Sequence, residues 1–125
     1  PVDHVERTGL PVALGQDDIE DAYYPYGRHD MLEVAFLASH LLDLRTGTDQ
    51  LRLVDMVTTQ AARVMGIAGH AIQTGAPADL CVHDQERVVD LIREHAAPRW
   101  VVARGRVVAE TATATTFHLP AQARE

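Results

Sequence analysis

The sequence is short of several residue types, and each shortage excludes a class of protein. Cys81 is the only cysteine, so no disulfide can form within the chain, and a reducing cytoplasm fits best. Ser39 is the only serine and no Gly-x-Ser-x-Gly stretch occurs, which excludes serine hydrolases of that type. A Gly-rich phosphate loop is absent, as are the His-x-Glu and Pro-Cys-x-x-Cys motifs of one class of zinc deaminase.

Lysine is also missing, and all eleven basic residues are arginines. The net charge is -7 and no basic run occurs, so nucleic acids and anionic membranes are not expected partners. No apolar run approaches the ~20 residues needed to span a membrane, and no signal peptide is visible. The remaining composition, with 46% hydrophobic and 23% charged residues among 125, is that of a small globular domain.

The most informative stretch runs from Leu10 to Gly27 and reads LPVALGQDDIEDAYYPYG. Its apolar start, Leu10 to Leu14, predicts a buried strand that runs directly into Asp17 and Asp18. In α/β enzymes, acidic residues that directly follow a strand lie at the rim of the sheet. The two aspartates are therefore candidates for a metal ligand or an acid–base pair, and the plainer alternative is a solvated acidic turn.

Four acids fall within residues 17–21, with no basic residue between them and Arg28. Unpaired like charges favour a bound cation or bound protons, which strengthens the functional interpretation. The aromatic residues that follow, with their Pro and Gly neighbours, predict a shaped loop. Their side chains either stack on a planar ligand or only pack the loop: they are Tyr23, Tyr24 and Tyr26.

Helices are predicted before and after this stretch, and one of them is unusual. A helix ends near Gly9, and further helices cover residues 28–44, 48–57 (begun by Thr48 or Asp49) and 60–65. The helix over 28–44 is apolar almost around its whole circumference, and such a helix is normally buried on several sides. This small chain offers little to bury it against, which indicates missing partners.

The second half of the chain is richer in strands. The predicted elements are a strand over 78–83, a helix over 87–95 and a hairpin around Gly105 made of strands 99–104 and 106–110. The expected organisation has four parts: a helical part over 1–66, a linker over 67–77, a strand-rich segment over 78–116 and a polar tail over 117–125.

For the histidines and the cysteine, structural roles are favoured over functional ones. The seven histidines form neither a His-x-His pair nor an i, i+4 pair on one helix face, so no complete zinc site is expected from this chain alone. His40, on the apolar helix, is predicted to be a satisfied core residue. His29 follows the aromatic loop and either faces a site or is a surface residue at a helix start, and the second is favoured. Cys81 lies in a strand pattern and is predicted to be a buried thiol.

Long parts of the sequence resemble one enzyme family. GLPVALGQDDIEDAYYPYGRHDMLEVAFLASHL is similar to the eighth strand and following loop of cytosine deaminase and its relatives in the amidohydrolase superfamily. TTQAARVMGI resembles the helix after their barrel, and GAPADLCVHD and PRWVVARGRVVAET resemble the C-terminal strands of their small β-sandwich. The resemblance covers about residues 9–116.

The resemblance implies an α/β fold class: the last β/α portion of a metal-dependent (β/α)8 barrel plus the C-terminal strands of a small β-sandwich. Because a barrel takes about 250 residues, it also implies that the chain is a fragment of a longer protein. The remaining barrel segments would then be its partners.

The resemblance also implies roles for single residues. Family members bind one divalent metal, zinc or iron, through histidines of earlier strands and an aspartate of strand eight, and only the aspartate has a counterpart here. Asp17 matches it, as metal ligand and catalytic proton acceptor. Asp18 matches the neighbouring acid of the substrate pocket, and Tyr23 a loop residue that walls the ring. With this one carboxylate, the chain alone is expected to bind no metal and to be inactive.

The implied reaction is hydrolytic deamination of a small planar heterocycle with release of ammonia. The loop departs from the pattern of cytosine deaminase, because Glu20 and Tyr23 stand where that enzyme tends to carry bulky aromatics. The ring therefore stays open between cytosine, a triazine such as an ammelide, and another cyclic amidine.

Two rival interpretations are non-catalytic. In the first, the chain is a free-standing, inactive remnant or interaction domain, and a homo-oligomer forms because another copy covers its apolar helix. In the second, an acidic pocket binds a planar base without turnover.

Overall fold

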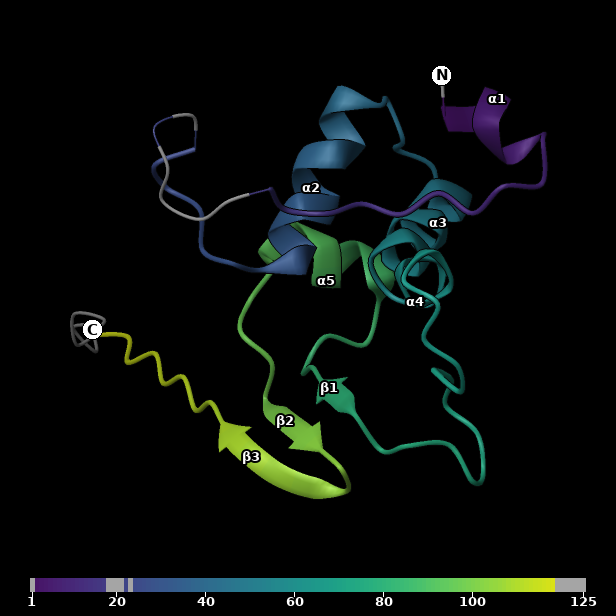
Figure 1. The fold of residues 1–125 in the computed structure, drawn as a ribbon. Helices are drawn as coiled ribbons and strands as arrows, with labels where there is room; N and C mark the ends of the chain where they lie inside the picture. The colour runs from purple at the N-terminus through teal and green to yellow at the C-terminus, as the bar shows by residue number, and fades with distance from the viewer. Residues whose placement is uncertain (1, 18–21, 23, 119–125) are drawn as a thin grey trace.

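The computed structural model describes residues 2–17, 22 and 24–118, and it places a group of helices beside a small sheet (Figure 1). The helices are α1 (Val2–Glu6), α2 (Met31–Leu41), α3 (Gly47–Val57), α4 (Thr59–Val64) and α5 (Val88–Glu94). The strands are β1 (Leu80–Val82), β2 (Trp100–Ala103) and β3 (Arg106–Glu110). A mixed α/β chain with an antiparallel sheet in its second half is thus confirmed.

The core lies where α2, α3 and α5 meet. Ala35 and Leu53 are fully buried, and Ala38, Leu44 and Ile92 complete the same cluster. The two alanines are three residues apart on α2, so they share one face and allow the neighbouring helices to approach closely. Leu53 of α3 is therefore the large side chain that fills this junction.

The strand predicted over Leu10 to Leu14 is wrong. In this segment the backbone N–H of Leu14 donates to the carbonyl of Met56 at 3.1 Å, and no residue of it pairs with β1, β2 or β3. A strand exists only with a partner that completes its ladder of hydrogen bonds, and an apolar run does not specify that partner. Leu14 nevertheless packs against the helical core, so the run still places Asp17 near the helices.

The predicted helices form, with boundaries set by their caps. The helix predicted over 28–44 is shorter, because the Asp30 carboxylate accepts the N–H of Leu32 at 2.9 Å and starts α2 there. The start predicted at Thr48 or Asp49 is also wrong. Thr46 caps α3, and its side chain and that of Asp49 form a reciprocal capping box.

The small sheet has the order β1-β2-β3, and all its pairs are antiparallel. The hairpin predicted around Gly105 is confirmed: Arg104 and Gly105 have φ values of 51° and 74° between β2 and β3. Positive φ at both central residues is the geometry of the tight turns that suit twisted strand pairs.

Two burial predictions are wrong. Cys81 is exposed, because β1 is an edge strand and the described residues place no second layer over its outer face. His40 is exposed near the end of α2, with its Nδ1 2.9 Å from the carbonyl oxygen of Phe36 and its ring edge-on to the Phe36 ring. His29 is a surface residue before α2, as predicted.

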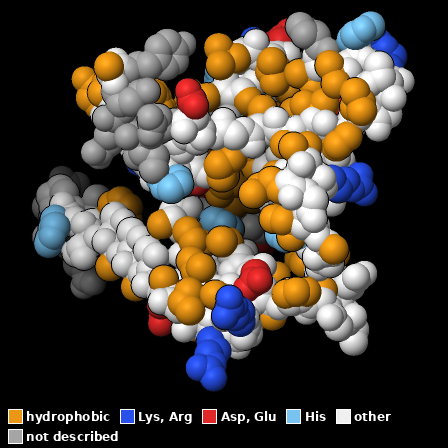
Figure 2. Space-filling model, in the orientation of Figure 1, with side chains coloured by type: hydrophobic (Ala, Val, Ile, Leu, Met, Phe, Trp, Pro, Cys, Tyr) orange, Lys and Arg blue, Asp and Glu red, His pale blue; other side chains and the backbone are white. Residues whose placement is uncertain are grey.

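Hydrophobic side chains also remain on the surface of the helical part (Figure 2). On α2, the side chain of Leu41 is 83% exposed and that of Leu37 is 38% exposed. The prediction that α2 lacks enough cover within this chain is therefore confirmed for the described residues. Within the same residues, every helix is too short or too polar to cross a bilayer.

Candidate functional site

A cavity of about 380 Å³ lies between residues 14–17, the loop at Tyr24 and one face of α2. Its polar side chains are Gln16, Asp17 and Tyr24, whereas α2 contributes an apolar wall that includes Val34 and Ala38. A mostly apolar hollow with a few converging polar groups is the usual form of a small-molecule site. A smaller cavity of about 220 Å³, between α2, α3 and α5, has no acidic residue in its lining.

Asp17 lies at the rim of the cavity beside α2, with its side chain exposed. Asp17 thus follows the apolar run and borders a cavity, but the strand end predicted for it is not present, and its role stays a prediction. Asp18 and Tyr23, the predicted substrate-binding residues, lie outside the described residues. Their roles stay predictions.

Gln16 is a site residue that the sequence patterns did not single out. Both amide atoms, Nε2 and Oε1, are buried, and neither has a hydrogen-bond partner among the described residues. A buried polar group without a partner costs about 1–3 kcal/mol, so such a pair calls for an explanation. The sequence did contain one sign that Gln16 belongs to the site: it is a polar residue between the apolar run and the two aspartates. An amide that is neither donating nor accepting is available to a ligand or another segment.

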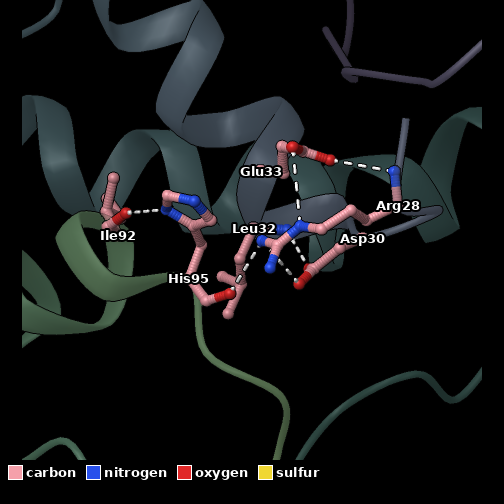
Figure 3. Close-up of polar contacts among 6 residues, drawn as sticks. All are labelled: Arg28, Asp30, Leu32, Glu33, Ile92 and His95. Atoms are coloured by element: carbon pink, nitrogen blue, oxygen red, sulfur yellow. Dashed lines mark hydrogen bonds and ion pairs between the residues drawn. The ribbon is translucent and has the colours of Figure 1, made fainter. Parts of the chain in front are cut away.

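Tyr24 borders the cavity near the start of α2. The pKa of Tyr24 is raised, first by burial and then by the nearby carboxylate of Glu33. The same Glu33 carboxylate accepts the backbone N–H of Arg28 at 3.2 Å and lies 3.6 Å from the Arg28 Nε (Figure 3). The end of this loop at Arg28 is thus attached to the first turn of α2.

The described residues fit a divalent metal only in part. A carboxylate oxygen such as that of Asp17 is a common ligand for zinc and other divalent metals. Among the described residues, however, no three histidine, cysteine or acidic side chains come close enough together to hold a metal ion. Asp17 therefore fits as one ligand of a site whose other ligands come from elsewhere.

The sequence pattern of the amidohydrolase family matches residues 1–109 of the chain. The chain belongs to the amidohydrolase family. It is 30% identical over 109 residues to N-isopropylammelide isopropyl amidohydrolase of Pseudomonas sp. (strain ADP), which covers 86% of this chain. It is 32% identical over 101 residues to pterin deaminase of Rhizobium rhizogenes (strain K84 / ATCC BAA-868), which covers 80% of this chain.

Solved structures of the amidohydrolase family agree with these sequence matches. The chain superposes on 5-methylcytosine deaminase from Klebsiella pneumoniae liganded with phosphonocytosine, with a TM-score of 0.84 and 25% identity over 94% of its length. It spans 29% of that structure and 27% and 23% of the two curated relatives. The family resemblance inferred from GLPVALGQDD and the later segments is therefore confirmed.

The tight packing around Gly27 leads to a prediction about the stability of this amidohydrolase chain. A Cβ on Gly27 would lie 2.8 Å from the Gln16 Nε2 and 2.9 Å from the Tyr24 ring. We expect Gly27→Ala to lower the free energy of unfolding by about 1–3 kcal/mol, because these side chains must move apart. Urea unfolding measures this loss. Gly47→Ala is the matched control, since a Cβ there meets nothing within 4 Å, and an equal loss in both variants would contradict the packing argument.

Proposed function

We propose that the intact protein is a metal-dependent hydrolase that deaminates a small planar nitrogen heterocycle. Water replaces the exocyclic amino group of the ring carbon, the C–N bond breaks, and ammonia leaves. The observation that carries the proposal is the cavity in which Asp17 stands beside the uncommitted amide of Gln16. Relatives named for ammelide, pterin and 5-methylcytosine support a ring of this class.

Asp17 would act as both a metal ligand and a proton carrier. One divalent metal, zinc or iron, would be held by Asp17 together with ligands from other segments, and such a metal lowers the pKa of a bound water from ~16 towards ~7. The Asp17 carboxylate would accept a proton from the attacking water and help to return one to the departing ammonia. Its exposed place at the cavity rim allows contact with both.

Two neighbours would bind the ring. Asp18 follows Asp17 directly and would accept a hydrogen bond from a ring or amino N–H. Tyr23 would wall the planar ring from the loop side, next to Tyr24, which lines the cavity. Both roles come from the family pattern of strand eight and its loop.

The surface of α2 supports a place for this chain within a larger assembly. The proposed architecture is the last β/α portion of a (β/α)8 barrel over residues 1–66, a linker over 67–77 and strands of a β-sandwich over 78–116. Leu37 and Leu41 are exposed here and line the same cavity, so neighbouring segments of a barrel that cover them would also close that side of the cavity. The second candidate function is that of an inactive chain that self-associates. In that case another copy of the chain would cover the same surface of α2.

Ammonia release by the full-length natural protein tests the proposed function. The protein would be supplied with zinc or iron and offered cytosine, an ammelide and a pterin in turn. We expect turnover of at least one ring, with metal retained after dialysis. Binding of a ring without ammonia release would support a non-catalytic binder instead, and a metal-free oligomer that binds none of the rings would support the inactive self-associating chain.

A further inference from the structure

The side chain of Gln16 lines the cavity beside α2, and its amide forms no hydrogen bond with the described residues. We propose that Gln16 is a ring-binding residue that determines which heterocycles the site accepts, by pairing with a ring edge that carries an N–H next to a C=O. The inference rests on the proposed function for the class of ring, whereas the state of the Gln16 amide in the ring-free protein does not depend on it.

The amide of Gln16 is enclosed between the loop and the cavity wall. Its Nε2 lies 2.8 Å, and the Tyr24 ring 2.9 Å, from the point where a Cβ on Gly27 would stand, so the missing side chain of Gly27 leaves the room that the amide occupies. Both Nε2 and Oε1 are shielded from solvent there, and neither has a partner among the described residues. The described part of the chain thus buries a donor and an acceptor without pairing them.

This arrangement leaves the amide free to serve a ligand. Nearly all buried polar atoms in proteins have a hydrogen-bond partner, and the exceptions call for an explanation such as a missing ligand. Turning Gln16 about its own side-chain bonds breaks no hydrogen bond with the described residues, and the side chain already borders a cavity of about 380 Å³. A ring in that cavity can therefore pair with the amide at little cost, and pairing removes the penalty of leaving both atoms unsatisfied.

The chemistry of a primary amide defines the ring edge that it recognises. Its NH2 group donates and its carbonyl oxygen accepts, and the two lie side by side. They match a ligand edge that presents an acceptor next to a donor, such as a ring C=O beside a ring N–H. Cytosine, ammelide and pterin all carry this lactam edge. The Gln16 amide therefore favours such rings over rings that lack both groups.

The rest of the described cavity wall does not offer the same pair. The wall from α2 is apolar, with Val34 and Leu37 among its side chains, so it packs against a ring and leaves the polar edge unpaired. Asp17 as a carboxylate only accepts, and the proposed function assigns it to the metal and the reacting water. Because Gln16 precedes Asp17 directly in the chain, an edge bound by its amide lies near that carboxylate.

A purely structural role for Gln16 makes a different prediction. In that case another segment of the full-length protein pairs with the amide, and an apolar replacement breaks those hydrogen bonds and lowers stability. If the amide serves a ring instead, the replacement removes two unpaired polar atoms, and the stability of the ring-free protein does not fall. The stability of the ring-free protein therefore separates the two roles.

The test uses the full-length protein with cytosine, an ammelide and a pterin as probes. Gln16→Met replaces the amide by an apolar, flexible side chain of similar length. We expect KM to rise about 10- to 100-fold for each ring that the parent protein turns over, the effect of losing two hydrogen bonds to a buried amide. Inhibition by 4-aminopyrimidine, which lacks the ring C=O and N–H, should change by less than about threefold, because it never paired with the amide.

Gln60→Met is the matched control. Gln60 is a half-buried glutamine of α4 that lies outside this cavity, and its Nε2 donates to the Asp55 carboxylate at 3.0 Å. The control should lower the urea midpoint of unfolding and leave every KM unchanged, whereas Gln16→Met should keep or raise the midpoint. A Gln16→Met protein that is as destabilised as the control, or that does not fold, would overturn the proposal.

The outcomes distinguish this inference from the proposed function. An unchanged KM in Gln16→Met, or an equal loss of affinity for 4-aminopyrimidine, would overturn the role of Gln16 and leave the deaminase reaction standing. A parent protein that binds a ring without releasing ammonia would overturn only the proposed function, and the dissociation constants of the same rings would then test Gln16. A parent protein that binds none of the three rings would overturn both.

Discussion

Replacing Asp17 by Asn in the full-length protein is expected to reduce ammonia release by roughly 10²–10⁴-fold, the range for losing a positioned proton carrier. Asparagine has nearly the same shape as aspartate, so the cavity rim should be preserved. Its side chain, however, cannot accept a proton as a carboxylate does, and it is a weaker metal ligand. The rate of ammonia release and the metal bound per chain are the two measurements.

Asp43→Asn is the matched control for this substitution. Asp43 is an exposed aspartate just beyond the end of α2, and its carboxylate pairs with Arg45 at the surface. Its φ is 58°, a value that asparagine adopts readily, so the exchange should leave both activity and metal content unchanged. An Asp17→Asn protein with full activity and full metal content would overturn the role assigned to Asp17.

The largest expected effect on stability comes from Leu53. Its side chain has no exposed surface and fills the junction of α2, α3 and α5. Truncation to alanine removes buried methyl groups and leaves a cavity among neighbours that can close only in part. We expect Leu53→Ala to lower the free energy of unfolding by about 2–5 kcal/mol, measured by urea denaturation.

Leu51→Ala in the same helix separates core packing from helix propensity. Leu51 is 61% exposed, and the change from leucine to alanine has the same effect on helix propensity at both positions. Its free energy of unfolding should therefore change by less than about 0.5 kcal/mol. Similar losses at Leu51 and Leu53 would show that this junction is not the core of the protein in solution.

Local patterns were enough to predict most of the elements. The apolar repeat of α2, the Gly105 turn and the short helices before Gly66 depend on residues a few positions apart, and the structure has each of them. The prediction for Asp17 also rests on a local pattern, an apolar run that ends in acids, and its role stays a prediction. The family membership rests on such stretches too, and the match over residues 1–109 agrees with it.

Helix boundaries were less certain, since competing caps lay within a few residues of one another. Thr46 begins α3 in place of Thr48, because only Thr46 has Asp49 three residues later to complete the capping box. Asp30 likewise caps α2, so the helix begins at Met31, three residues after the predicted start at Arg28.

The sequence by itself determined the family, the helical and strand-rich halves and the acid at the end of the apolar run, because these are encoded by neighbouring residues. Only the tertiary structure decided that Leu10 to Leu14 joins no sheet, that Cys81 and His40 are exposed, and that Glu33 holds the end of the cavity loop at Arg28. Strand pairing, burial and the unpaired amide of Gln16 depend on which distant segments approach one another. Periodicity along a chain describes one face of an element, and it does not specify what that face will meet.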